Sequence, residues 1–132
     1  MKITVDTNVL VRSVVRDDKK QAIVAEKLFR EFETVVVPLA CLCELVWVLD
    51  SVYGFSRVEI LGAVEALEQA PNIALDRTAV EAGMAVLRNG ADFAYGVIAH
   101  EGKWLGGDLF SSFDKRAVNA VSRLGHQTRL LS

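Results

Sequence analysis

The sequence predicts an α/β fold, a three-layer α/β/α sandwich with a central parallel sheet. Short runs rich in β-branched residues alternate with longer stretches whose apolar residues recur every three or four positions, a pattern typical of strands followed by helices. The helical stretches span about ten residues or more, which suits the crossover connections between parallel strands. With 132 residues, 52% of them hydrophobic, the chain is expected to form one domain over residues 1–132.

In the N-terminal half, turn and capping signals set the ends of the expected elements. Pro38 stops a β-branched run, because proline cannot donate to a sheet. Gly54 ends a helix, and Ser56 is expected to cap the next one with Glu59 completing a capping box. In order, we expect a strand at Lys2–Val5, helices at Asn8–Val15 and Gln21–Phe32, a strand at Thr34–Val37, and helices at Leu39–Tyr53 and from Ser56 to Gln69.

In the C-terminal half, glycine pairs and capping residues separate the expected elements. Asn89-Gly90 closes one helix, Asp92 caps the next, and Gly106-Gly107 breaks the chain before a further strand. In order, we expect a strand at Asn72–Leu75, helices at Thr78–Arg88 and from Asp92 to Trp104, a strand at Leu109–Phe113, a helix at Lys115–Leu124 and a strand at Gln127–Leu131.

Charge and composition argue against several classes of protein. The net charge is −2 and the pI about 5.7, so the chain lacks the basic character of a non-specific DNA-binding protein. No stretch approaches the roughly 20 apolar residues of a membrane span, and Asp6 comes too early for a signal-peptide core. Cys41 and Cys43 are too close together for a disulfide framework or a zinc site. We therefore expect a cytoplasmic protein without membrane association.

Two aspartates directly follow predicted strands. Asp6 comes after Ile3-Thr4-Val5, and Asp114 comes after Phe110-Ser111-Ser112-Phe113, each at the start of a helix. Because ligands of open parallel α/β sheets bind outside the carboxyl ends of the strands, these carboxylates are candidates for a shared site. Taken singly, each is equally well explained as an N-cap. Their occurrence at equivalent ends of one predicted sheet favours the site.

Glu44 is the only charged residue in the fifteen positions from Val35 to Leu49. A helix that is apolar almost all round is expected to be buried, and an unpaired carboxylate is costly there. An ion pair with Arg or Lys would explain such a position, and so would a cation shared with other acids. Asp92 begins a predicted helix and is either an N-cap or a further ligand of that cation.

These acids predict metal-assisted hydrolysis of a phosphate ester. Oxygen ligands without nearby His or Cys favour Mg²⁺ or Mn²⁺ over Zn²⁺, and such an ion orients a phosphodiester and activates the attacking water. His100 and His126 are isolated and are expected to have surface or packing roles. No P-loop or dinucleotide-binding motif is present. The predicted metal-binding and catalytic residues are Asp6, Glu44, Asp92 and Asp114.

Four short motifs follow one another along the chain. They are Asp6-Thr7-Asn8-Val9-Leu10, Glu44 in an apolar helix, Gly90-Ala91-Asp92-Phe93-Ala94 with Ile98-Ala99, and Ser112-Phe113-Asp114-Lys115. In this order they resemble the PIN domain, and more closely the VapC toxins of bacterial type II toxin–antitoxin systems. The resemblance implies that Asp6, Glu44 and Asp114 bind metal. It also implies a hydroxyl at Ser112 beside them and a polar pocket residue at Asn8.

The same resemblance implies an activity and a set of partners. The activity is that of a Mg²⁺- or Mn²⁺-dependent endoribonuclease that cuts RNA, often tRNA or another translation-associated RNA, and arrests growth. A VapB antitoxin would neutralise the toxin, and operator DNA would be bound only through the antitoxin. Homodimers and higher toxin–antitoxin assemblies are usual. Trp47, Trp104 and Phe110 are candidates for such surfaces, although we expect each of them to be buried in the core.

The sequence departs from the family pattern at Tyr95. The resemblance places a second acidic metal ligand at this position, one helical turn after Asp92. Tyrosine is neutral near pH 7, so the predicted site loses a negative charge, and we hypothesise that the enzyme is impaired. The alternative function is a catalytically lapsed binding module that acts in antitoxin binding and operon control. A third interpretation is a metal-dependent phosphatase that acts on small substrates.

Cationic side chains near the predicted pocket are expected to contact the RNA backbone. Arg12 and Arg16 lie one turn apart on the helix after Asp6, and Lys115 and Arg116 directly follow Asp114. Ordinary solvated surface charge explains each of them about as well.

Overall fold

All neighbouring strands are parallel, as the alternation of strands and helices predicts. One sheet has the order β1-β2-β3 and consists of β1 (Lys2–Thr4), β2 (Thr34–Val36) and β3 (Ile73–Ala74). In a second sheet, β4 (Phe110–Ser112) pairs with β5 (Thr128–Leu130). Each strand lies within the range predicted from its β-branched or apolar run.

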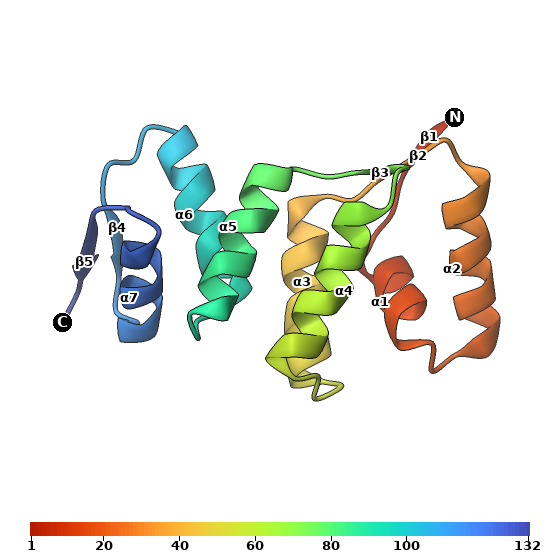
Figure 1. Ribbon diagram of the computed structural model, residues 1–132, viewed down its shortest axis with the longest axis horizontal. Coiled ribbons are helices and arrows are strands. Elements are labelled where there is room, and N and C mark those ends of the chain that lie inside the picture. The colour runs from red at the N-terminus through yellow and green to blue at the C-terminus, as the bar shows by residue number, and fades with distance from the viewer. The chain divides into compact units, whose positions relative to one another are not determined.

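The computed structural model describes residues 1–132, which divide into two compact units. Unit 1 comprises residues 1–76 and unit 2 comprises residues 77–132. In Figure 1, unit 1 runs from red to yellow-green and unit 2 from green to blue. The expectation of a single domain over residues 1–132 stays a prediction.

Unit 1 combines the three-stranded sheet with four helices, α1 (Thr7–Val15), α2 (Lys19–Glu31), α3 (Leu39–Ser51) and α4 (Arg57–Gln69). α1 packs against α2 and α3, and α3 packs against α4 (Figure 1). The predicted capping box at the start of α4 is present, since the Glu59 N–H donates to Ser56 Oγ (3.1 Å) and the Ser56 N–H donates to Glu59 Oε1 (2.9 Å).

The apolar helix α3 has one buried face and one exposed face, which corrects the expectation that it is buried all round. Leu42, Leu45 and Leu49 are fully buried, and their three- and four-residue spacing keeps them on one side of the helix. Trp47 is 63% exposed and Glu44 is also exposed. The apolar composition of α3 therefore exceeds what the core of unit 1 covers.

Unit 2 contains three helices, α5 (Arg77–Arg88), α6 (Phe93–Trp104) and α7 (Lys115–Arg123). Two of them, α5 and α6, are in close contact. A Cβ atom on Gly96 of α6 would lie 2.2 Å from the carbonyl oxygen of Ala82 on α5. A Cβ atom on Gly83 would lie 2.6 Å from the ring of Phe93. Only glycine allows the two helix backbones to approach this closely.

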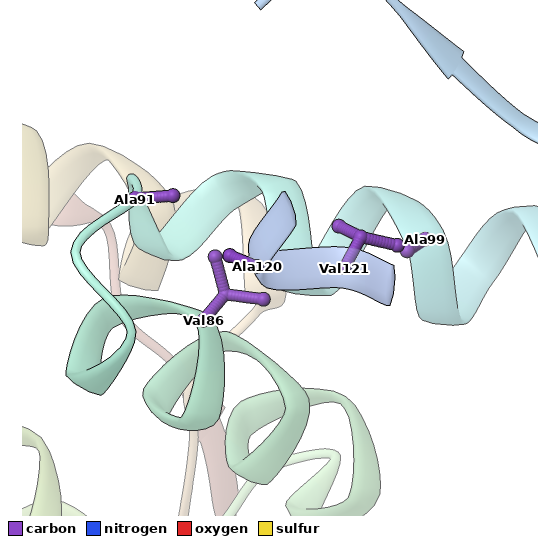
Figure 2. Packing of buried hydrophobic residues seen from close by; sticks show 5 residues of the cluster. All are labelled: Val86, Ala91, Ala99, Ala120 and Val121. Atoms are coloured by element: carbon purple, nitrogen blue, oxygen red, sulfur yellow. The ribbon is translucent and has the colours of Figure 1, made fainter. Parts of the chain in front are cut away.

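The core of unit 2 contains a cluster of small apolar side chains (Figure 2). Partly buried Tyr95, Phe110 and Leu124 pack against this cluster. Phe110 therefore contributes to the core as expected, whereas Trp104 is 85% exposed, contrary to its expected burial. The cluster consists of Val86, Ala91, Ala99, Ala120 and Val121.

None of the helices is both long and apolar enough to cross a membrane.

Candidate active-site residues

Asp6 lies where the β1 ladder gives way to α1. The N–H of Val5 still extends the ladder by donating to the carbonyl oxygen of Val36 (3.1 Å). Asp6 then takes the N-cap position of α1, and its Oδ1 accepts a hydrogen bond from the N–H of Val9 (3.3 Å). The N-cap interpretation is therefore confirmed. The side chain remains exposed, so capping leaves the second carboxylate oxygen accessible.

Thr7 connects α1 to Glu44 on α3. Its Oγ1 donates a hydrogen bond to Glu44 Oε2 (3.1 Å). Thr7 is only 9% exposed and is the one buried polar residue of the chain, so this bond links a fixed donor to a more exposed carboxylate. Asp6 adjoins Thr7 in sequence, and the two acids of unit 1 are thus joined through a single threonine. We call Asp6, Thr7 and Glu44 the unit 1 acid group.

The structure corrects the predicted environment of Glu44. Its side chain is exposed rather than buried, and it forms no salt bridge with Arg or Lys. The ion-pair explanation is therefore wrong. Exposure has a simple physical cause, because Glu44 lies on the face of α3 opposite its buried leucines. A solvated carboxylate avoids the desolvation cost that made the position anomalous in the sequence.

In unit 2, Asp92 and Asp114 begin α6 and α7. Asp92 holds the N-cap position of α6 without a capping hydrogen bond from its side chain. Asp114 does cap α7, since its Oδ1 accepts hydrogen bonds from the N–H groups of Arg116 (2.9 Å) and Ala117 (3.2 Å). Both backbone donors use the same oxygen, so Oδ2 of Asp114 is not committed to the cap.

Ser112 orients the turn that presents Asp114. Its Oγ accepts a hydrogen bond from the Asp114 N–H (3.0 Å). This bond joins the last residue of β4 to the N-cap of α7, and it fixes the backbone of Asp114. The hydroxyl predicted beside the acids is therefore adjacent to one of them and acts on its main chain.

Tyr95 is influenced by both acids of unit 2. Its ring meets Phe110 edge to face, with centroids 6.3 Å apart and an interplanar angle of 76°. Burial raises the pKa of its phenol, and the negative charge and hydrogen bonding of Asp114, together with the charge of Asp92, raise it further. These effects favour the neutral phenol. We call Asp92, Tyr95, Asp114 and Ser112 the unit 2 acid group.

The acids of each unit are donors that suit a hard divalent cation. Their carboxylates offer oxygen ligands of the kind that Mg²⁺ and Mn²⁺ prefer, and none of the four forms a salt bridge. The structure gathers no group of three or more acids, histidines or cysteines in the arrangement of a metal site. A shared metal site of the four acids therefore stays a prediction.

The predicted cations of unit 1 are engaged with acids. Arg12 Nη1 lies 2.9 Å from Asp17 Oδ1, and Arg16 Nη1 lies 3.4 Å from Glu26 Oε2. Arg16 does not continue the helix as expected. It ends α1 in the left-handed conformation, with φ of 58°. Asn8 is exposed and lines a groove of about 280 Å³ with Arg12.

The predicted cations of unit 2 are not engaged in this way. Lys115 and Arg116 are exposed in the first turn of α7, and neither forms a salt bridge. Their positive charges lie next to Asp114 in sequence and are free to meet a phosphate.

The PIN domain family matches residues 3–122 of the chain. The chain belongs to the PIN domain family. This membership confirms the predicted fold class, a three-layer α/β/α fold with parallel strands. PIN domains are typically nucleases and generally use divalent metal ions. No curated protein matches the chain, so the finer resemblance to VapC toxins rests on its own residues.

Thr7 is the functional candidate that sequence reasoning missed. It belongs to the Asp6-Thr7-Asn8 motif, but no role was assigned to it because its partner Glu44 lies 37 positions away. A buried threonine directly after a strand-end aspartate was the available signal. Its partner could be identified only from the packing of α1 against α3.

Proposed function

We propose that this PIN domain protein is a metal-dependent endoribonuclease toxin of a type II toxin–antitoxin pair. It hydrolyses RNA phosphodiesters, with tRNA as the first candidate substrate. One observation carries the proposal. Asp6 and Asp114, carboxylates without salt bridges, follow strands β1 and β4, where a nuclease of this family needs acids. The carboxyl ends of parallel strands are also where α/β proteins bind their ligands.

The proposed roles of the acids follow from their contacts. Asp6, Glu44, Asp92 and Asp114 would hold Mg²⁺ or Mn²⁺, which when bound neutralises charge on the scissile phosphate and lowers the pKa of the attacking water. Thr7 positions Glu44 through its hydrogen bond, and Ser112 positions the backbone of Asp114. Asn8, exposed at the start of α1, is available to contact the sugar or base.

The proposed RNA contacts come from four cations. Lys115 and Arg116 are exposed and without salt bridges, so they can neutralise phosphates directly. Arg12 and Arg16 form ion pairs at exposed positions, and exposed ion pairs are weak enough to exchange for a phosphate. We therefore assign Lys115 and Arg116 the larger share of backbone binding.

The proposed partners are a VapB-type antitoxin and a second copy of the chain. Exposed apolar side chains support an interaction surface on unit 1, including Ile23 (59% exposed) and Val24 (66%) on α2 and Trp47 (63%) on α3. Contact with operator DNA would be made only by the antitoxin. The proposed location is the cytoplasm, where translation-associated RNA is found.

The alternative function is a catalytically lapsed PIN domain that retains antitoxin binding and operon control. One observation favours it, namely the phenol of Tyr95, whose pKa is raised by burial, by Asp114 and by Asp92. The neutral phenol adds no negative charge to these acids, and its interaction with Asp114 engages that carboxylate.

RNA cleavage with Mn²⁺ tests the proposal. Purified protein is incubated with a tRNA pool, and Asp6→Asn and Asp114→Asn are compared with the unchanged chain. Asp108→Asn is the matched control, because Asp108 precedes β4 rather than following it. We expect cleavage that both site variants abolish and the control retains. Cleavage that survives both substitutions would refute the assignment, whereas no cleavage by the unchanged chain would favour the lapsed module.

A further inference from the structure

Unit 2 contains a cavity of about 730 Å³ at the end of β4 and β5 opposite Asp114. Its walls come from the C-terminal half of α6 and from the segments that enter the two strands, including Asp108 and His126. Every residue that lines it belongs to unit 2. The volume falls within the range of small-molecule binding sites, which is roughly 300–1,000 Å³.

Two basic side chains line this cavity, and a third, His100, acts on one of them. Lys103 and His126 line it. Burial lowers the pKa of His126, and the charges of Lys103 and His100 lower it further. A lowered pKa with two basic neighbours means that His126 experiences a positive field. His100 and His126, which look isolated in the sequence, are therefore neighbours of one another and of a lysine.

The basic cluster has no counter-charge of its own. None of its three side chains forms a salt bridge. Asp108 also lines the cavity, but it comes within 4.0 Å of neither Lys103 nor His126. An anion placed between Lys103 and His126 would receive a charge-assisted hydrogen bond from Lys103. Its negative charge would also favour the protonated imidazole of His126, which then donates a second such bond and is no longer repelled by Lys103.

The remaining walls are apolar or without side chains. Ile98 is 54% exposed and Leu109 is 41% exposed, and both line the cavity. Gly107 and Gly125 line it as well, so no side chain extends into it from either of these positions. A ligand that suits this lining combines an anionic group with an apolar or planar body.

We propose that this cavity is a binding site for a small phosphomonoester of nucleotide size. A phosphomonoester carries a charge of about −1.5 to −2 at pH 7 and three strong acceptor oxygens, which matches a cluster of basic donors better than a singly charged phosphodiester. The body of a nucleotide would lie against Ile98 and Leu109. The proposal is independent of nuclease activity, because the cavity lies at the other end of β4 from Asp114.

Calorimetric titration with adenosine 5′-monophosphate at pH 6.5 tests the proposal. We expect binding that Lys103→Gln and His126→Gln each weaken by about tenfold, the loss of one charge-assisted hydrogen bond. Arg129→Gln is the control, since it removes one exposed cation from β5 outside the cavity. Its affinity should change less than twofold, and adenosine without phosphate should not bind. Equal binding to all variants, or no binding to the unchanged chain, would overturn the proposal.

NMR titration of His126 provides a second measurement that does not require a variant. An anion beside His126 should raise the lowered pKa of this side chain. The negative charge of Asp108 acts in the same direction, whereas the positive charges of Lys103 and His100 act in the opposite direction. An unmoved pKa at saturating nucleotide would overturn the proposal. Inorganic phosphate that binds as tightly as the nucleotide would overturn the role of the apolar walls.

A pair of RNA dinucleotides, with and without a 5′-phosphate, distinguishes free nucleotides from RNA ends. Binding of the phosphorylated form alone would support an RNA terminus as the source of the ligand. Binding of neither, with binding of the mononucleotide, would support a free nucleotide. Equal binding of both forms would contradict recognition of a phosphomonoester.

Discussion

The acid groups of the two units differ in their neighbours. In unit 1, Asp6 adjoins a buried threonine whose hydroxyl donates to Glu44 over 3.1 Å. In unit 2, Asp92 and Asp114 both act on the phenol of Tyr95, whose ring packs on Phe110. The first arrangement leaves two solvated carboxylates, and the second adds a neutral phenol to two carboxylates.

Under the proposed function, this difference predicts where cation binding can be strengthened. A negative charge at position 95 of unit 2 should strengthen it, whereas unit 1 needs only to keep its threonine bond. The packing beneath the two acid groups differs as well. Unit 2 depends on a glycine-mediated approach of two helices, whereas the acids of unit 1 depend on one side-chain hydrogen bond.

The largest expected effect is that of Tyr95→Asp on activity. A third carboxylate beside Asp92 and Asp114 should increase Mn²⁺-dependent RNA cleavage on the order of 100-fold, by the size of effects seen when the surroundings of a metal site are altered. Tyr95→Asn is the matched control, since it removes the ring without adding charge, and it should not increase cleavage. Calorimetric titration with Mn²⁺ should show tighter metal binding by Tyr95→Asp than by Tyr95→Asn or the unchanged chain. Equal, robust cleavage before and after Tyr95→Asp would contradict impairment.

The next effect contrasts glycines in helices of the two units. Gly96→Ala should destabilise unit 2 by about 3 kcal/mol, because its Cβ would meet the α5 backbone at 2.2 Å and overpacking costs this much or more. Gly62→Ala in α4 meets nothing within 4 Å and should stabilise unit 1 by about 0.5–1 kcal/mol. Hydrogen exchange measured in α4 and α6 tests both expected changes in stability. Similar changes in stability for Gly96→Ala and Gly62→Ala would contradict the close approach of α5 and α6.

Thr7→Val tests the threonine link of unit 1. The substitution keeps the shape of the side chain but removes the hydrogen bond to Glu44, so the free energy of unfolding should fall by about 1 kcal/mol. RNA cleavage should fall more than stability does, because Glu44 loses its positioning. Thr7→Ser keeps the hydroxyl and should restore most of the activity. Loss of activity in Thr7→Ser equal to that in Thr7→Val would show that packing, not the hydrogen bond, matters.

A smaller effect separates the cations of the two units. Lys115→Ala should weaken RNA binding and leave the stability of the fold unchanged. It should also reduce the slope of the logarithm of the binding constant against the logarithm of salt concentration by about one. Arg12→Ala should reduce the salt dependence less, because Arg12 already pairs with Asp17. Filter binding at several salt concentrations measures both slopes. An unchanged affinity for Lys115→Ala at low salt would contradict the contact.

The smallest effect concerns the acid stability of unit 1. A hydrogen bond from Tyr53, and then the charge of Arg12, lower the pKa of Asp17 below its ordinary value of 3.8. A lowered carboxyl pKa contributes stability that is present above pH 3.8 and is lost as the pH falls through the folded-state value. Tyr53→Phe should raise the pKa of Asp17 toward 3.8 and reduce this contribution.

The capping box supplies the control for that measurement. Hydrogen bonds with the backbone and side chain of Ser56 lower the pKa of Glu59 below 4.5. NMR titration of the carboxyl groups should therefore show a shift of Asp17 alone in Tyr53→Phe and of Glu59 alone in Ser56→Ala. A shift of both groups in either variant would indicate a change in the fold rather than loss of one bond.

The sequence by itself determined the order and type of the elements, the fold class and the identity of most candidate residues. It could do so because β-branched runs, helical periodicity and capping residues act locally, as the capping box of Ser56 and Glu59 shows. Tyr95 was also recognisable as a neutral residue at an acidic position from sequence comparison alone.

Only the tertiary structure decided the surroundings of these residues. Glu44 is solvated rather than buried because the opposite face of α3 covers the core, and Thr7 meets it only through the packing of α1 on α3. His126 becomes a neighbour of His100 and Lys103 only when the segment before β5 folds back on α6. Such contacts join residues far apart in the chain, so they depend on packing free energy that no local pattern encodes.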